Sequence, residues 1–206
     1  MAEKAVSSRL KRSLRVGGLA ATLACLAWPG VAGEIPRRLV DRVQSWAKHP
    51  TVVITLRNRN QQFNDLEQHE IDSLDRDWRR QTSSDKQPLI AEVTGAPLSM
   101  FLLRQQARSG GQFIEVFVMD ARGLNAGISA VTSDYWQGDE PKFQQTFGVG
   151  ADAVFVGEVE RKGDTGHRAQ QISFTITDPE TDKRIGAITA EVNLDVADLY
   201  ATPAQR

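Results

Sequence analysis

A change of hydrophobic periodicity near residue 110 constrains the fold of this chain more than any other feature. From residue 34 to about 109, apolar side chains recur every three or four positions, as on one face of a helix. From residue 112 to 194, apolar and polar side chains mostly alternate, as in half-buried strands. Helices followed by strands predict an α+β fold, with N-terminal helices packed on one face of a five-stranded antiparallel sheet.

The same pattern, together with proline and glycine at the ends of the segments, gives the expected elements. Helices are expected over 34–49, 50–63, 64–81, 97–108 and 139–147, and strands over 112–120, 124–131, 153–160, 168–178 and 184–194. In the third helix, Asn64 and Glu67 have the spacing of a capping box. Asp139 is expected to cap the short helix that it begins.

The first 33 residues have the pattern of a secretory signal peptide. Five basic residues come before an apolar run of 13 residues, and small residues follow it up to Gly33. The run is shorter than the roughly 20 residues of a membrane-spanning helix, so we expect cleavage near Gly33 and a periplasmic or secreted bacterial protein without stable membrane insertion. An uncleaved N-terminal anchor is the alternative. The single cysteine, Cys25, lies in the segment removed, so the mature chain can form no disulfide.

The charge of the chain argues against a nucleic-acid partner. The sequence has 25 basic and 26 acidic residues. The first 33 residues contain five of the basic residues and one of the acidic residues. The remaining chain therefore has 20 basic and 25 acidic residues. Nucleic-acid binding needs a basic surface, which this composition does not supply.

One face of the predicted sheet is polar. Strand parity places Gln171, Ser173 and Thr175 on the same side of their strand. Thr189 and Glu191 share one side of the last strand in the same way. This face could meet solvent or line a polar pocket, and the connection over 131–150 is the one long enough to cover it.

That connection contains the stretch TSDYWQGDE at 132–140, with two aromatic rings and three carboxylates. Asp134, Asp139 and Glu140 could supply acids for a hydrolase. No nucleophile, histidine or metal-ligand set has the spacing to complete such a site, and a turn and a helix cap explain the first two acids. We expect no catalytic residue, no cofactor and no metal. A hydrolase that uses the acidic loop remains an alternative.

Residues 98–196 as a whole resemble the extracytoplasmic PAS-like sensor modules called Cache domains, in their single-module form. The resemblance rests on a strand and turn of the form VFVMDARG, on TSDYWQGDE, and on IGAITAEVNL at 185–194. It implies a helical segment over 34–96 and a ligand-binding domain over 97–200. The ligand would lie under the connection between the second and third strands.

The resemblance also implies roles for individual residues. Two aromatic rings would form the wall or lid of the pocket, two charged side chains would anchor the ligand, and two strand residues would form the floor. These residues are, in that order, Tyr135 and Trp136, Asp134 and Lys142, and Ser173 and Thr175.

The sequence does not determine the chemical class of the ligand. Acids beside aromatic faces favour an amine or an amino acid, whereas Lys142 near a helix start favours a carboxylate. Family members usually lie between two membrane spans, and no second apolar span follows the last predicted strand. We therefore expect a separate membrane-bound signalling or transport protein as partner. An envelope assembly module that binds another protein, without a small ligand, is the alternative.

Overall fold

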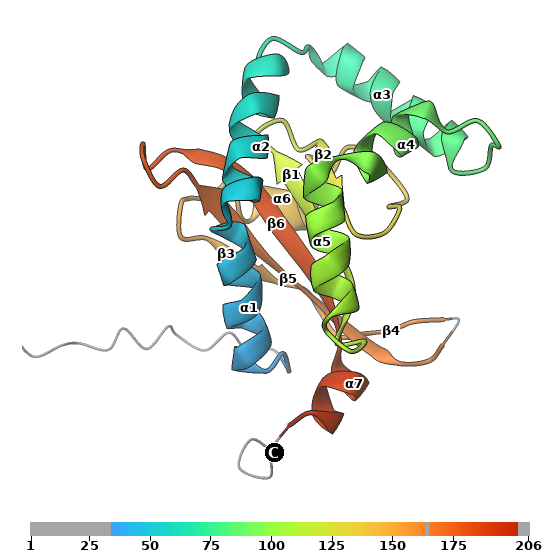
Figure 1. Cartoon of the computed structure of the whole chain (residues 1–206), viewed down its shortest axis with the longest axis vertical. Coiled ribbons are helices and arrows are strands. Elements are labelled where there is room, and N and C mark those ends of the chain that lie inside the picture. Colours follow the sequence, from blue (N-terminus) through green and yellow to red (C-terminus); the bar gives the residue numbers. More distant parts are fainter. Residues whose placement is uncertain (1–33, 164, 202–206) are drawn as a thin grey trace, which may run out of the picture. The chain divides into compact units, whose positions relative to one another are not determined.

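The computed structural model describes residues 34–163 and 165–201, and these residues belong to one compact unit (Figure 1). The predicted signal peptide lies outside the described residues. The helices are α1 (Arg37–Ala47), α2 (Pro50–Gln62), α3 (Gln68–Gln81), α4 (Pro88–Gly95), α5 (Pro97–Ala107), α6 (Pro141–Gln144) and α7 (Leu194–Leu199). The strands are β1 (Phe113–Asp120), β2 (Asn125–Ile128), β3 (Val154–Val156), β4 (Glu160–Arg161), β5 (Arg168–Thr177) and β6 (Arg184–Asn193). The predicted α+β class is confirmed.

The sheet is antiparallel, with the strand order β2-β1-β6-β5-β3, and β4 pairs with the beginning of β5. Five strands were expected and six are observed in the described residues, because residues 157–159 are not in strand conformation and divide the third expected strand into β3 and β4. The last strand ends at Asn193, whose side-chain oxygen accepts a hydrogen bond from the Val196 N–H at 3.1 Å. That contact caps α7, a helix that the strand pattern did not predict.

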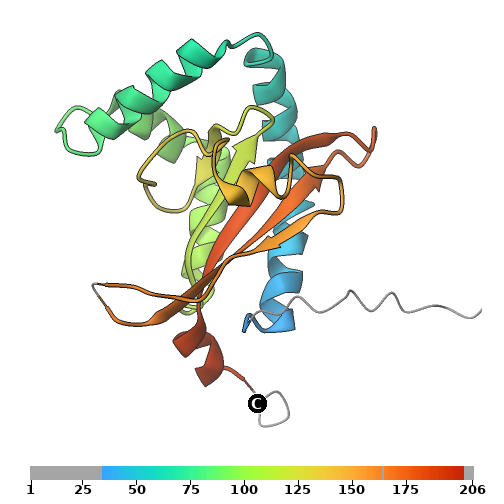
Figure 2. The same cartoon turned by 180° about the vertical axis from the view of Figure 1, so that it is seen from behind.

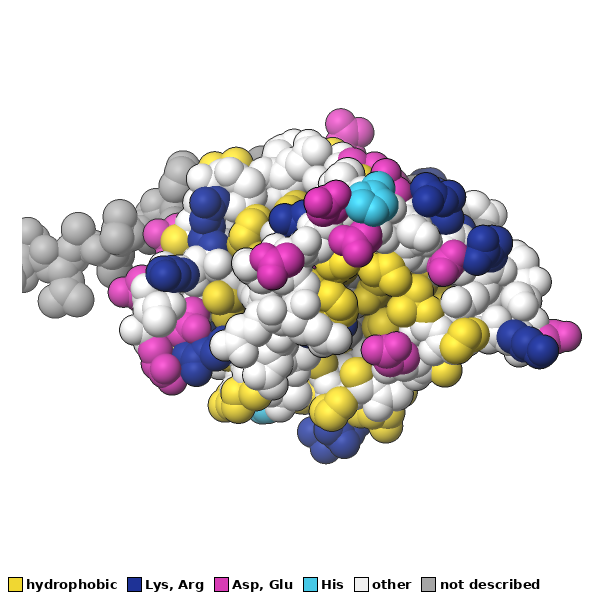
Figure 3. Space-filling model, turned by 90° about the horizontal axis from the view of Figure 1, so that it is seen from above, with side chains coloured by type: hydrophobic (Ala, Val, Ile, Leu, Met, Phe, Trp, Pro, Cys, Tyr) yellow, Lys and Arg dark blue, Asp and Glu magenta, His cyan; other side chains and the backbone are white. Residues whose placement is uncertain are grey.

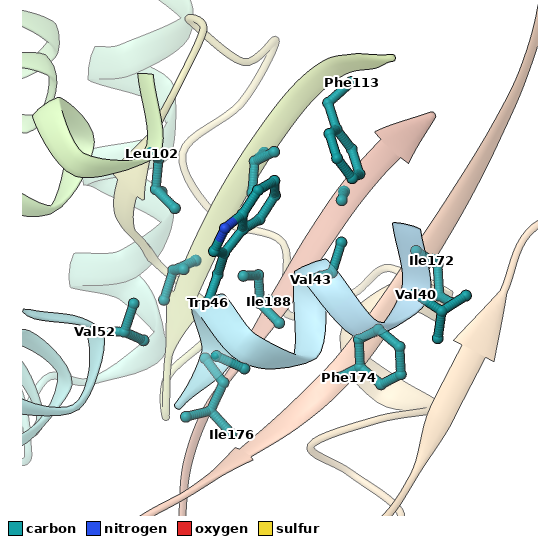
Figure 4. Close-up of a cluster of buried hydrophobic side chains, with 14 of the residues drawn as sticks. Val40, Val43, Trp46, Val52, Leu102, Phe113, Ile172, Phe174, Ile176 and Ile188 are labelled. Atoms are coloured by element: carbon teal, nitrogen blue, oxygen red, sulfur yellow. The ribbon is translucent and has the colours of Figure 1, made fainter. Parts of the chain in front are cut away.

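The helices α1, α2 and α5 cover one face of the sheet (Figure 1). The apolar side chains of Ile35, Leu39, Val43 and Trp46 follow the helical spacing and are buried there. These side chains join apolar residues of the central strands in one cluster, and Figure 4 shows part of it. The Trp46 ring lies 4.9 Å from the Phe113 ring between centroids. Each large apolar side chain buried in this way contributes about 1.5–3 kcal/mol.

A second apolar cluster forms on the opposite face of the sheet. Along β1, Val116 and Val118 belong to the first cluster, whereas Phe117 and Met119 belong to the second. Residues of α3, α4 and the connection over 129–150 complete it, and Figure 2 shows this connection lying over the sheet. Figure 3 views the end at which α2, α3 and α4 lie and shows apolar side chains gathered in a hollow among charged ones.

The helices α3 and α6 begin later than the sequence predicts, as α1 does by three residues. α3 begins at Gln68, and the N–H of Glu67 donates to the Glu70 carboxylate at 2.8 Å, so the predicted capping role of Asn64 is wrong. The residue before α6 is Glu140, which makes no side-chain cap hydrogen bond, so the predicted cap Asp139 is wrong as well. Acidic residues cluster at both starts, and the packing of the helix decides which of them precedes its first turn.

Candidate functional site

The register of the sheet places charged and polar side chains in a row across its second face. Glu115 on β1 lies opposite Glu191 on β6, and Glu191 lies opposite Gln171 on β5. The next row along the strands holds Phe117, Thr189, Ser173 and Phe155. The polar surface expected from strand parity is therefore one continuous floor, with its carboxylates side by side.

The connection over 129–150 is held above this floor by α3 and by β2. The Asp75 carboxylate on α3 accepts hydrogen bonds from the backbone N–H groups of Tyr135 at 2.8 Å and Trp136 at 3.1 Å. The Trp78 indole N–H donates to the Thr132 carbonyl oxygen at 2.9 Å. On the other side, the Asn125 N–H donates to the Tyr135 carbonyl oxygen at 3.0 Å. Residues 132–136 are thus fixed from two directions.

The short helix α6 carries Lys142 to the floor. Pro141 occupies the first turn, and Phe143 stacks on Phe147 with ring centroids 5.1 Å apart. The Lys142 ammonium lies 5.3 Å from the centre of the Phe117 ring and 2.8 Å from the Glu140 carboxylate. Its side chain is only 12% exposed. The lysine is therefore mostly removed from solvent and already has a counter-charge.

Two cavities lie between the floor and the connection, and Lys142 lines both. The larger has a volume of about 270 Å³, and its lining includes Glu140, Phe155, Gln171 and Glu191. The smaller has a volume of about 120 Å³, and its lining includes Glu115, Phe117, Thr132, Asp134 and Gln137. Small-molecule pockets measure about 300–1,000 Å³, so the two cavities together suit a small ligand.

The acids of the floor differ in their partners. The Glu191 carboxylate pairs with the Lys162 ammonium at 2.5 Å. In the described part of the chain, no hydrogen bond or ion pair reaches the Glu115 carboxylate. Burial, and after it the negative charge of Glu191, raises the pKa of Glu115, although Lys142 and Lys162 oppose this effect. The floor thus contains a half-buried carboxyl group, Glu115, that is costly to ionise.

Four of the six predicted ligand-binding residues lie on this face. Asp134 and Lys142 line the smaller cavity. Ser173 and Thr175 are buried on the floor and do not line either cavity. The Ser173 hydroxyl lies 2.8 Å from the Thr189 hydroxyl, whereas the Thr175 Oγ1 has no hydrogen-bond partner among the described residues. Contact of these four residues with a ligand stays a prediction.

The structure places the two aromatic rings of the connection away from both cavities, unlike the wall or lid expected from the sequence. Tyr135 is 2% exposed and stacks on Trp78 with centroids 5.2 Å apart, and its hydroxyl accepts a hydrogen bond from Arg59 Nη2 at 2.9 Å. The half-buried Trp136 donates its indole N–H to the Arg122 carbonyl oxygen at 2.8 Å. Backbone pairing with Leu124 and Asn125, together with the hydrogen bonds to the Asp75 carboxylate, directs these rings into the second cluster and the loop.

Sequence reasoning missed three residues that shape this site. Glu115 shares a strand face with Phe117, which was a usable signal, but its place opposite Glu191 depends on register. Gln137 lines the smaller cavity and is 1% exposed, although the sequence shows it only as a polar loop residue. Asp75 looks like a solvated helix residue, yet it holds the connection through backbone hydrogen bonds.

Residues 34–163 and 165–201 contain no group of three or more His, Cys, Asp and Glu side chains placed to hold a metal ion. Within the same ranges, no helix has both the length and the apolar character needed to cross a lipid bilayer.

Comparison with known proteins gives structural neighbours at low identity. No protein-family model matches the chain, and no curated protein matches it. The ligand-binding domain of a Pseudomonas aeruginosa amino-acid chemoreceptor in complex with GABA has a TM-score of 0.35 and 14% identity over 78% of this chain and 62% of that one. The sensor domain of the V. cholerae histidine kinase DctB has a TM-score of 0.36 and 11% identity, and the match covers 70% of this chain and 58% of that one. The ligand-binding domain of a Pseudomonas fluorescens chemoreceptor in complex with L-serine has a TM-score of 0.36 and 12% identity, and the match covers 79% of this chain and 63% of that one. The chain thus spans less than two thirds of each of these structures.

Proposed function

We propose that this protein is an exported sensor or binding protein of the single-Cache type. It takes up a small polar ligand between the sheet and the connection over 129–150, and it passes the bound state to a separate membrane protein. The observation that carries the proposal is the pair of cavities that share Lys142, one of about 270 Å³ and one of about 120 Å³. The pattern of the first 33 residues supports export.

The way in which the connection is fixed supports ligand sensing. Its hydrogen bonds to Asp75 and its pairing with β2 hold residues 132–137, while α6 faces the cavities. A ligand that contacts Lys142 therefore acts on a segment that is tied to α3 on one side and to the sheet on the other. This arrangement offers a route from the site to the surface of the molecule.

The acids of the connection also fit binding better than hydrolysis. The Asp134 carboxylate is engaged by Gln137 Nε2 at 2.6 Å and by Arg79 at 3.4 Å, and Glu140 is paired with Lys142. Both carboxylates are therefore already engaged by neighbouring donor groups. We therefore propose a protein without enzymatic activity.

The test is a thermal-shift screen with small amines, amino acids and carboxylates, because a ligand that binds the native state raises Tm by mass action. We expect one class to raise Tm in the purified protein and Lys142→Met to change the size of that response, because Lys142 lines both cavities. Lys86→Met is the matched control, since Lys86 is exposed in the loop before α4 and lines neither cavity. Absence of a shift with all three classes would contradict the proposal.

A further inference from the structure

We propose that the smaller cavity binds a primary ammonium group, and that the ligand is a small amine without a carboxylate. This inference rests on the proposed function and deepens it by selecting one class among amines, amino acids and carboxylates. The basis is the set of polar groups around the cavity that still lack a partner.

Gln137 supplies the first unpaired acceptor. Its side chain lines the smaller cavity and is 1% exposed. Its Nε2 donates to the Asp134 carboxylate at 2.6 Å and to the Asp134 carbonyl oxygen at 3.2 Å. Because both partners can only accept, this end of the amide is the NH₂ group and the other end is the oxygen. That oxygen, Oε1, is buried and receives no hydrogen bond from the described residues. A donor group that reached this oxygen would remove this unfavourable state.

Glu115 supplies the second acceptor on the lining of the same cavity. Its carboxylate makes no hydrogen bond or ion pair within the described ranges, and it lies opposite Glu191 in the sheet register. Two acids at opposing positions of neighbouring strands repel each other when both are ionised. A cation beside Glu115 would stabilise its ionised form.

The cations near Glu115 already have partners. Lys142 pairs with Glu140 at 2.8 Å, and Lys162 pairs with Glu191 at 2.5 Å. A ligand carboxylate would have to displace one of these acids and would stand next to Glu115, which adds a like charge to a partly buried site. Free carboxylates and amino acids are therefore disfavoured.

A primary ammonium group has the matching properties. It offers three hydrogen-bond donors and no acceptor, whereas the unpaired groups here are the Gln137 oxygen and the Glu115 carboxylate. The volume of about 120 Å³ is about four times the share of one water molecule in the liquid, which is room for an ammonium group with one or two carbons.

The experiment titrates the full mature protein with three probes that differ in one group: ethylamine, alanine and propionate. We expect ethylamine to raise Tm, and alanine and propionate to give no shift at equal concentration. Glu115→Gln should weaken ethylamine binding about tenfold or more, because it removes the charge of the acceptor. Glu92→Gln is the matched control, since Glu92 is exposed on α4 and lines neither cavity.

The outcomes separate this inference from the proposed function. If alanine or propionate raises Tm and ethylamine does not, the site binds a ligand but the ammonium assignment is overturned. If none of the three raises Tm, and no compound in the wider thermal-shift screen raises it either, both proposals are wrong. Equal weakening of ethylamine binding by Glu115→Gln and Glu92→Gln would also overturn the assignment, because it would indicate general surface electrostatics.

A measurement on the unmodified protein covers the case in which Glu115→Gln does not fold. The groups that face Glu115 are Glu191 on β6, Lys142 on α6, Lys162 after β4 and Asp134 in the connection. Because the pKa of Glu115 is raised, its carboxyl gains a proton as pH falls toward the ordinary value of 4.5, while ethylamine keeps its charge. Ethylamine affinity should therefore fall over this range, and an unchanged affinity would refute the role of Glu115.

Discussion

The ring of Tyr135 provides the sharpest test of the difference between a pocket wall and a core residue. It is 2% exposed, lies parallel to Trp78 within 15°, and receives a hydrogen bond from Arg59 through its hydroxyl. Truncation of a buried aromatic side chain to alanine typically costs about 3–5 kcal/mol. We therefore expect Tyr135→Ala to lower the free energy of unfolding by about 4 kcal/mol.

Tyr135→Phe separates the hydroxyl from the ring. It keeps the stacking on Trp78 and removes one acceptor from Arg59, which retains contacts to the buried Asp120 at 3.3–3.4 Å. The expected loss is about 1 kcal/mol, the usual contribution of one hydrogen bond. The control is Tyr200→Ala, because the only other tyrosine is 55% exposed and its truncation should cost less than about 0.5 kcal/mol.

Urea unfolding followed by tryptophan fluorescence measures all three variants. The reasoning is refuted if Tyr135→Ala costs less than about 1 kcal/mol, the size of a surface effect. If that variant stays as stable as the parent and loses its response to ligand, the ring belongs to the binding site, as the sequence resemblance implied. A loss of stability in Tyr135→Ala that is matched by Tyr135→Phe would instead assign most of the effect to Arg59 and Asp120.

Two further predictions concern stability elsewhere in the domain. The hydrogen bonds from Arg57 lower the pKa of Asp178 to about 2, so this carboxylate stabilises the fold above its ordinary value of 3.8 and loses that effect as pH falls toward 2. Asp178→Asn should lower Tm at neutral pH and make Tm fall less steeply than in the parent as pH decreases toward 2. An equally steep fall of Tm in the variant would contradict this. Gly186→Ala should cost about 1–3 kcal/mol, because its Cβ would collide with the Met119 carbonyl oxygen. Gly150→Ala meets open space and should be neutral or slightly stabilising, and equal losses in both variants would show that the collision is not the cause.

Local patterns predicted most of the elements and the polar face of the sheet, but they missed α4 and α7. The stripe from Ile35 to Trp46 follows the helical period, and all four of its members are buried. Strand parity placed Ser173 and Thr175 on the polar floor, because side chains alternate along a strand whatever its neighbours are. Helix starts were less accurate, since several residues near each start can precede the first turn.

The sequence by itself determined an α+β chain with a polar sheet face and one connection long enough to cover it. Tertiary structure decided what that face contains, because strand register brings Glu115 opposite Glu191 across residues 76 positions apart. It also decided that Tyr135 turns into the core while Gln137 lines a cavity, since Asp75 and β2 fix the backbone between them. These outcomes depend on contacts between distant segments, which no local period encodes.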